Sequence, residues 1–531
     1  MATLAAITIT ISVIGLYYIL RIGRRESHLP PGPRPVPLLG NLLSIPTVNA
    51  HFQLKTWAEQ YGGIYSLKLF HTTTIVLSSR RLVRELIDKR GTTYSSRPPF
   101  LFATHYIARD PANIPLVVFM PSGEKWRLCR KLLAQCFNEA KVDKEYVGLV
   151  EAEATQMLCD FVKAPKGFMG HTLRFANSII KGLVYGTRTK HTEQLEEYEV
   201  WFEKYVALLE VGAIPPVDLL PWLIHVPQGL WTGRWKNWKD KSDESGRAVN
   251  AAFTQMAEPV LERRRRGVRA ATVYDYVLNE GEKGIDLTRR DLDVFAGSLI
   301  DAGSDTTASA IRVFIQAMVR YPDVQVRAHR QVDDVVGSMR SPGWSDVAKL
   351  PYVVQIIKEV MRWRPLAAMI PHSTTADDTI DGYFIPKNTT VLINIWALNH
   401  TPCDTDTCES PISEFNPDRY ATRTHTSSHY AASPDIASRD HFTYGAGRRI
   451  CPGIHLAERS LFIAIVKLLW AFEFKEKPGK PVDIDPETGF TDGIVRTPKD
   501  FECEIRVREG REGLLETEFA EARDVLAKYE F

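Results

Sequence analysis

The stretch FTYGAGRRICPG, residues 442–453, is the most informative part of this chain. It places a single cysteine, Cys451, among three glycines, which permit positive φ angles and close approach of the backbone to a bulky partner. An apolar helical pattern follows at once, so we expect Cys451 at a helix N-terminus, where N–H groups and the helix dipole favour a thiolate. Arg448 and Arg449 add positive charge suited to a ligand's carboxylates. A buried structural cysteine is the alternative, but it does not account for the arginines.

This stretch resembles the haem-binding loop of the cytochrome P450 family, FxxGxRxCxG. Gly447, Arg449, Cys451 and Gly453 match the pattern, while Tyr444 stands where the family has phenylalanine. The resemblance implies haem b (iron protoporphyrin IX), with Cys451 as the thiolate ligand of the iron and the other four residues around the haem. A hydroxyl at position 444 can change the polarity around the sulfur and so tune the iron.

Four further motifs occur in the family's order, and together they make the resemblance specific. Trp126 and Arg130 match the WxxxR helix, which in relatives faces the haem propionates. The other three are AGSDTT at residues 302–307, the ExxR pair Glu359 and Arg362, and FNPDRY at residues 415–420, which resembles the PERF segment and contains Arg419. An ExxR pair alone carries no weight, because it recurs by chance in many helices.

The resemblance implies a role for each group. Asp305 and Thr306 would deliver protons to oxygen, although a threonine inside a helix can instead bond back to a carbonyl. Glu359, Arg362 and Arg419 would form a structural triad that supports the cysteine loop. His372 stands where relatives often contact a propionate, with a satisfied core histidine as the alternative.

The expected fold is mainly α with smaller β-sheets, the cytochrome P450 fold. Helices are expected over residues 288–321, 351–364 and 454–472, from capping patterns, prolines and apolar spacing. Residues 64–77 predict a hairpin, and residues 378–394 predict strand, turn and strand with Asp381-Gly382 as the turn.

The N-terminal segment predicts a membrane anchor. Residues 2–20 carry no charge and, at about 1.5 Å each, would span about 28 Å as a helix. The arginines at 21, 24 and 25 place the following domain in the cytosol, whereas a cleaved signal peptide needs its basic residues before the apolar run. We therefore expect a single-pass protein of the endoplasmic reticulum membrane.

The remaining organisation follows from composition. We expect a proline-rich hinge at 29–41, a haem-thiolate catalytic domain at 42–510 and an acidic C-terminal extension at 511–531. The net charge of +2 gives no reason to expect a nucleic-acid partner. Seven scattered cysteines are a poor disulfide framework and indicate a reducing compartment. The basic run 263–266 is read as a solvated helix end, with partner or lipid docking as the alternative.

The expected activity is oxidation of a lipophilic small molecule by O2. No nicotinamide or flavin fingerprint is evident, so electrons would come from a separate NADPH-cytochrome P450 reductase. The resemblance is to filamentous-fungal members that serve secondary metabolism, some of which couple or cyclise their substrates. A haem-thiolate isomerase or dehydratase and a non-enzymatic haem sensor or carrier are the alternatives. The retained Asp305 and Thr306 weigh against both.

Overall fold

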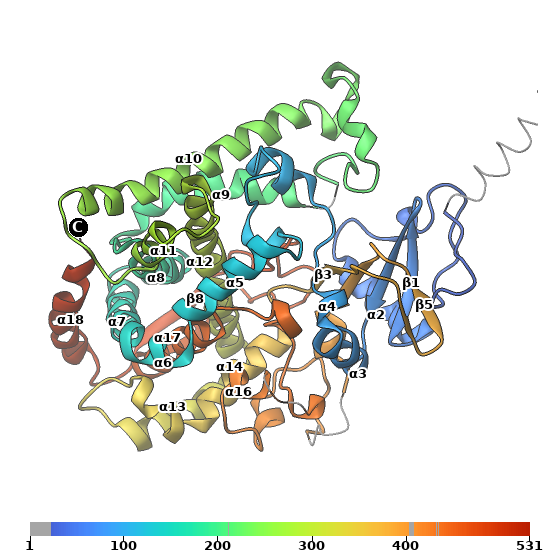
Figure 1. Cartoon of the computed structure of the whole chain (residues 1–531). Helices are drawn as coiled ribbons and strands as arrows, with labels where there is room; N and C mark the ends of the chain where they lie inside the picture. The colour runs from blue at the N-terminus through green and yellow to red at the C-terminus, as the bar shows by residue number, and fades with distance from the viewer. Residues whose placement is uncertain (1–22, 211, 403–407, 432, 434, 531) are drawn as a thin grey trace, which may run out of the picture.

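The computed structural model describes residues 23–210, 212–402, 408–431, 433 and 435–530 (Figure 1). Helices make up most of this part of the chain, as expected. The longer helices are α2 (Ala50–Tyr61), α5 (Glu124–Cys136), α7 (Val147–Lys163), α8 (Phe168–Tyr185), α9 (Glu196–Leu209), α10 (Trp238–Arg265), α11 (Val273–Glu282), α12 (Arg289–Arg320), α13 (Pro322–Val336), α14 (Pro351–Trp363), α17 (Ile454–Ala471) and α18 (Glu512–Leu526). The shorter ones are α3 (Arg80–Leu82), α4 (Gly91–Tyr94), α6 (Glu139–Lys141), α15 (Ile395–Asn399) and α16 (Ser427–Ala431).

Three small sheets accompany the helices. Their strands are β1 (Ile64–Leu69), β2 (Thr72–Leu77), β3 (Met369–Ser373), β4 (Asp378–Ile380), β5 (Tyr383–Ile385), β6 (Thr390–Asn394), β7 (Phe472–Glu476) and β8 (Cys503–Val507). The largest sheet has the order β1-β2-β6-β3, in which β2 and β6 are parallel and the other pairs antiparallel. Figure 1 shows this sheet at one side of the molecule, with the helical body beside it.

The long helix α12 runs through the helical body. Its first turn is closed by a capping box, in which the Thr288 hydroxyl accepts the Asp291 N–H and the Asp291 carboxylate accepts the Thr288 N–H. α8 packs along it more extensively than any other element, and α17 packs against both α12 and α7. The main hydrophobic core forms between these helices. α12 and α17 therefore meet at the centre of the molecule, just where the cysteine loop ends.

The three predicted helices and the predicted hairpin are confirmed to within one or two residues, whereas residues 378–394 form three strands, β4, β5 and β6, where two were expected. The segments 288–321, 351–364 and 454–472 are α12, α14 and α17, and residues 64–77 form the β1–β2 hairpin with Ile64 opposite Leu77. The Asp381-Gly382 turn joins β4 to β5, with φ of +50° and +82° at its two residues.

Two charged segments, the acidic C-terminal extension and the basic run 263–266, are held by contacts with the rest of the protein. The C-terminal extension contains α18, which packs against α7 and buries Leu515 and Leu526. In the basic run, Arg264 pairs with Asp275 and Glu282, while Arg265 and Arg266 pair with Glu262. Acidic neighbours therefore satisfy these arginines at a helix end, as the simpler interpretation expects.

The predicted anchor, residues 2–20, lies outside the described residues. Within the described part of the chain, no helix combines the length and apolarity that crossing a bilayer requires. The proline-rich segment 29–41 packs against the rest of the protein. It lies against β1, where the Ser66 hydroxyl donates to the Pro30 carbonyl at 2.6 Å and the Ser66 N–H donates to the Pro31 carbonyl at 2.8 Å.

Candidate active site

The cysteine loop is a series of tight turns that ends at α17. The Cys451 N–H donates to the Tyr444 carbonyl at 2.8 Å, and Gly453 is the N-cap of α17. Gly447 has a φ of +59°, and a Cβ there would collide with the carbonyl of Ile87. The loop glycine is thus required for backbone geometry, and it brings Cys451 to the N-terminus of α17 as the sequence predicts.

A cavity separates Cys451 from α12. It contains about 660 Å³ of space not filled by protein atoms, part of which is open to solvent. Its walls come from α5, α8, α12, α17 and the cysteine loop, and include Leu133, Phe137, Ile180, Ala302, Gly303, Thr306, Thr307, Cys451, Pro452, Gly453 and Leu456. Most of these side chains are apolar. Cys451 and the AGSDTT segment therefore line the same cavity.

The electrostatics at Cys451 suit a metal-bound thiolate. Burial raises the pKa of the Cys451 thiol, while the Gly453 N–H and the charge of Arg130 lower it. Burial is the largest of these effects, so the helix N-terminus alone does not secure the thiolate. A metal cation bound to the sulfur would do so, because coordination deprotonates a thiol.

Three arginines beside the cysteine loop, Arg97, Arg130 and Arg449, form a cluster of positive charge that is uncompensated within the described part of the chain. Arg130 donates to the Ile450 carbonyl at 2.9 Å, and Arg449 donates to the carbonyls of Ser95 and Met120 at 2.7 and 2.6 Å. Burial first, then neighbouring arginines, lowers the pKa of Arg449 to about 9, and burial and Arg130 lower that of Arg97 to about 10. Among the described residues, no carboxylate forms an ion pair with any of these three arginines.

Trp126 completes this cluster. Its ring lies under the Arg449 guanidinium, 4.1 Å from the ring centre, and its buried indole N–H has no partner among the described residues. Three mutually repelling guanidinium groups and a free N–H donor require an acceptor with negative charge. The two propionates of haem b supply this chemistry, so these residues fit the group that the cysteine loop implies.

Arg97 belongs to the cluster although the sequence does not single it out. It lies between α4 and η3 (Phe102–Ile107), where it follows no helical or strand pattern, and its guanidinium donates to the carbonyls of Val118 and Pro371. Only the folded chain brings Arg97 beside Arg130 and Arg449, so no spacing rule could have found it.

His372 lies on β3 and is buried. Its Nδ1 lies 2.8 Å from the Tyr94 carbonyl, so Nδ1 carries the proton, and burial lowers the pKa of His372 to about 3. This neutral tautomer presents a lone pair at Nε2. His372 would need a second proton before it could donate to a propionate.

The AGSDTT segment faces the cavity through Ala302, Gly303, Thr306 and Thr307. The Thr306 hydroxyl donates to the Ala302 carbonyl at 2.7 Å, which is the back-bonded arrangement, while its oxygen still lines the cavity. A Cβ on Gly303 would lie 3.0 Å from Ile180, so this glycine also lets α8 approach α12 closely.

Two acids lie one turn apart on α12. Burial raises the pKa of Asp305, and the charge of Arg312 partly opposes this. Asp301, which the sequence reasoning missed, accepts a hydrogen bond from the Tyr205 hydroxyl at 3.4 Å. Burial and the charge of Asp305 raise the pKa of Asp301 to about 7. The spacing of four residues was the signal that could have indicated it.

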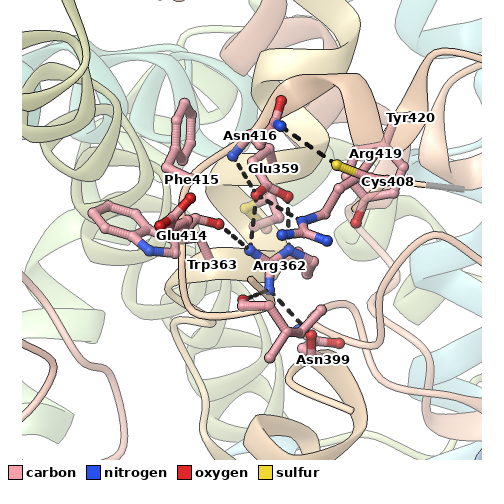
Figure 2. A network of polar contacts seen from close by, with 12 residues as sticks. Glu359, Arg362, Trp363, Asn399, Cys408, Glu414, Phe415, Asn416, Arg419 and Tyr420 are labelled. Atoms are coloured by element: carbon pink, nitrogen blue, oxygen red, sulfur yellow. Dashed lines mark hydrogen bonds and ion pairs between the residues drawn. The ribbon is translucent and has the colours of Figure 1, made fainter. Parts of the chain in front are cut away.

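The predicted triad forms, as Figure 2 shows. Glu359 and Arg362 make a bidentate pair at 2.6 and 2.7 Å, and the Arg419 guanidinium lies 3.5 Å from the same carboxylate. The Asn416 N–H donates to Glu359 at 2.8 Å. All three charged side chains are buried.

The triad reaches the cysteine loop through Asn399. Arg362 donates to the Asn399 carbonyl at 3.3 Å, and the Asn399 side chain accepts from the Phe442 N–H at 2.9 Å and donates to the Thr443 hydroxyl at 3.1 Å. Hydrogen bonds through Asn399 therefore connect the triad to Phe442 and Thr443, the first two residues of the loop that carries Cys451.

Comparison with known proteins agrees with this geometry. The cytochrome P450 family model matches residues 30–505. The chain is 44% identical over 520 residues to the cytochrome P450 monooxygenase patI of Aspergillus clavatus, covering 97% of this chain and 96% of patI. It is 44% identical, with the same coverage, to the monooxygenase acuD of Aspergillus aculeatus, and 42% identical to the monooxygenase macC of Penicillium terrestre, covering 100% of this chain and 99% of macC.

Proposed function

The chain belongs to the cytochrome P450 family, and we propose that it is a monooxygenase that oxidises a lipophilic small molecule in a fungal secondary-metabolite pathway. Haem is its cofactor, as in the rest of this haem-thiolate family. When bound, haem supplies the iron at which O2 is activated. The protein supplies the thiolate, the propionate site and the proton donors.

One observation carries the proposal: Cys451 and the AGSDTT segment of α12 line the same cavity. Cys451 would bind the haem iron through its sulfur, and Trp126, Arg130 and Arg449, joined by Arg97, would hold the propionates. His372, Tyr444 and Gly453 would also line the haem site. The mostly apolar walls favour an apolar substrate, which on binding would displace water from the proton-delivery groups.

Asp305 and Thr306 would be the catalytic residues that move protons. The Thr306 hydroxyl would turn from the Ala302 carbonyl to donate into the cavity, and Asp305 would restore its proton through water. Retention of both groups supports oxygen activation over an isomerase, a dehydratase or a carrier.

The electron donor would be an NADPH-dependent reductase in the same membrane. Residues 2–20 would anchor the chain in the endoplasmic reticulum, with the catalytic domain in the cytosol. The similar length of the fungal relatives supports a common architecture, because patI, acuD and macC are covered almost from end to end.

The deciding experiment starts with the carbon monoxide difference spectrum of the reduced protein. We expect a red-shifted band of the thiolate type, followed by O2 consumption that requires NADPH, reductase and substrate from a panel of fungal metabolites. Turnover without the reductase would identify an isomerase or dehydratase. A thiolate-type spectrum with no turnover across the panel would favour a sensor or carrier.

Replacing Thr306 with alanine should uncouple oxygen use from product formation. With the hydroxyl lost, product formation should fall by about 10²-fold while oxygen is still consumed and leaves as peroxide. The measurement is the ratio of product to peroxide per NADPH, on a substrate found in the panel. Thr306→Ser retains the hydroxyl and should restore coupling, whereas full coupling in the alanine variant would rule out the proton role.

A further inference from the structure

A second cavity adjoins the cysteine loop through Tyr444 and is separate from the cavity beneath α12. It contains about 330 Å³ of space not filled by protein atoms, part of which is open to solvent, between α14, α17 and the segment around Ser427. The space that a buried water could occupy is much smaller and suits a single water site. The walls from α14 are mostly apolar, while Tyr444, Glu458, His441 and Ser427 line its polar side. The roles proposed above for the cysteine loop do not involve this cavity.

Two buried polar atoms at this cavity lack a hydrogen-bond partner among the described residues. One is the hydroxyl of Tyr444 and the other is Oε2 of Glu458. The Oε1 atom of Glu458 accepts the Ser428 N–H at 2.7 Å. Oε2 forms an ion pair with Arg459, whose Nη1 lies 3.6 Å away, but the two atoms are beyond hydrogen-bond distance.

The other polar side chains at the cavity are already engaged. Ser427 bonds to His441 at 3.2 Å and to Asp440 at 3.1 Å, and Lys358 pairs with Asp440 at 3.1 Å. None of these neighbouring side chains therefore forms a hydrogen bond with the Tyr444 hydroxyl or with Oε2 of Glu458. Buried polar atoms of this kind are normally satisfied by ordered water.

We propose that this cavity holds ordered water that joins the Tyr444 hydroxyl to the Glu458 carboxylate, which makes Tyr444 a positioning residue for Cys451. The cavity meets the requirements of a buried water site, since it has room and at least two polar partners. The inference rests on the proposed function only in that Cys451 ligates the haem iron.

With this water in place, Tyr444 would be held both by its backbone carbonyl and by its side-chain hydroxyl. Its carbonyl accepts the Cys451 N–H at 2.8 Å, and its hydroxyl would be tied through water to α17, which begins directly after the cysteine loop. The hydroxyl would then be held away from the sulfur, and the ring would keep a fixed place beside the thiolate. A phenylalanine at this position could not make the second attachment.

A double-mutant cycle tests the link in the haem-loaded protein. In each of the variants Tyr444→Phe and Glu458→Leu, the rate at which the thiolate-type carbon monoxide band disappears should be about 3- to 10-fold higher than in the wild type. A change of this size is within the range expected for coupled residues. The double variant should be no faster than either single variant, and both should shift the iron reduction potential in the same direction. Glu458→Gln keeps a polar partner for the water and should stay near the wild type.

Tyr420→Phe is the matched control. Tyr420 is buried, and its hydroxyl donates to the Asp440 carbonyl at 3.4 Å without lining the cavity. This variant should leave the potential unchanged and show no coupling to Glu458. Additive effects of Tyr444→Phe and Glu458→Leu, or a potential shift in Tyr420→Phe, would overturn the proposal.

A crystal structure of the haem-loaded wild type gives an independent test. We expect water within hydrogen-bond distance of both the Tyr444 hydroxyl and the Glu458 carboxylate. A dry cavity, or a tyrosine hydroxyl bonded to the cysteine sulfur, would contradict the inference. Failure of the haem-ligand assignment has a different signature, because the wild type would then lack the thiolate-type band. Failure of the monooxygenase activity alone would leave both the band and these variant effects in place.

Discussion

Alanine at position 451 should leave a folded protein that no longer binds haem through sulfur. Cys451 is the cysteine on the cavity wall opposite Ala302 and Thr306, so its loss removes the thiolate while the arginine cluster remains. Haem binding should weaken strongly, and any haem retained should give no thiolate-type band in the carbon monoxide spectrum. Monooxygenase turnover should be lost with it, since the thiolate is what favours O–O cleavage.

Cys503→Ala serves as the control for this experiment. Cys503 is a half-buried cysteine on β8, and it does not line the cavity. Its replacement should leave the spectrum intact. Cys451→His should give a band of the nitrogen-ligand type, because imidazole can bind iron from the same loop. An unchanged thiolate spectrum in Cys451→Ala would refute the ligand assignment, and circular dichroism would confirm that the variant is folded.

Local patterns predicted the central elements well. α12 was readable because a capping box and a proline mark its two ends, and α17 because an apolar run follows the glycine-rich loop. The β1–β2 hairpin was readable from alternation. Each of these signals is local and spans only a few residues, so no tertiary information is needed to recognise it.

Contacts between residues far apart in the chain could not be predicted from local sequence patterns. The parallel pairing of β2 with β6 joins segments more than 300 residues apart, and no local pattern encodes it. Arg97 joins Arg130 and Arg449 only in the folded chain, and Asp301 gains its importance from Tyr205 on α9. The predicted helix-terminus preference for a thiolate was incomplete, because the depth of burial at Cys451 depends on the whole fold.

Replacing Glu359 with glutamine should destabilise the protein by about 3–5 kcal/mol, because it removes the buried negative charge that pairs with both Arg362 and Arg419. Globular proteins are stable by only about 5–15 kcal/mol. The variant should therefore lose a large share of its folded population. The measurement is chemical unfolding of the haem-loaded protein, followed by circular dichroism and by the thiolate-type band.

The Glu280–Lys283 pair provides a matched control with the same spacing of three residues. Its carboxylate and ammonium lie 2.6 Å apart at the surface, where solvent screens them, so Glu280→Gln should have little effect. Comparing the two substitutions separates the effect of burial from that of helical pairing.

The two probes together distinguish support of the loop from general stability. The triad holds the cysteine loop through Asn399, which bonds to Phe442 and Thr443. In Glu359→Gln, the thiolate-type band should therefore be lost at lower denaturant than the helical signal, since the loop loosens before the helices unfold. Coincident loss of both signals would mean that the triad stabilises the whole domain and gives the cysteine loop no particular support. A stability equal to that of the wild type would mean that the buried arginines find other partners once the carboxylate is gone.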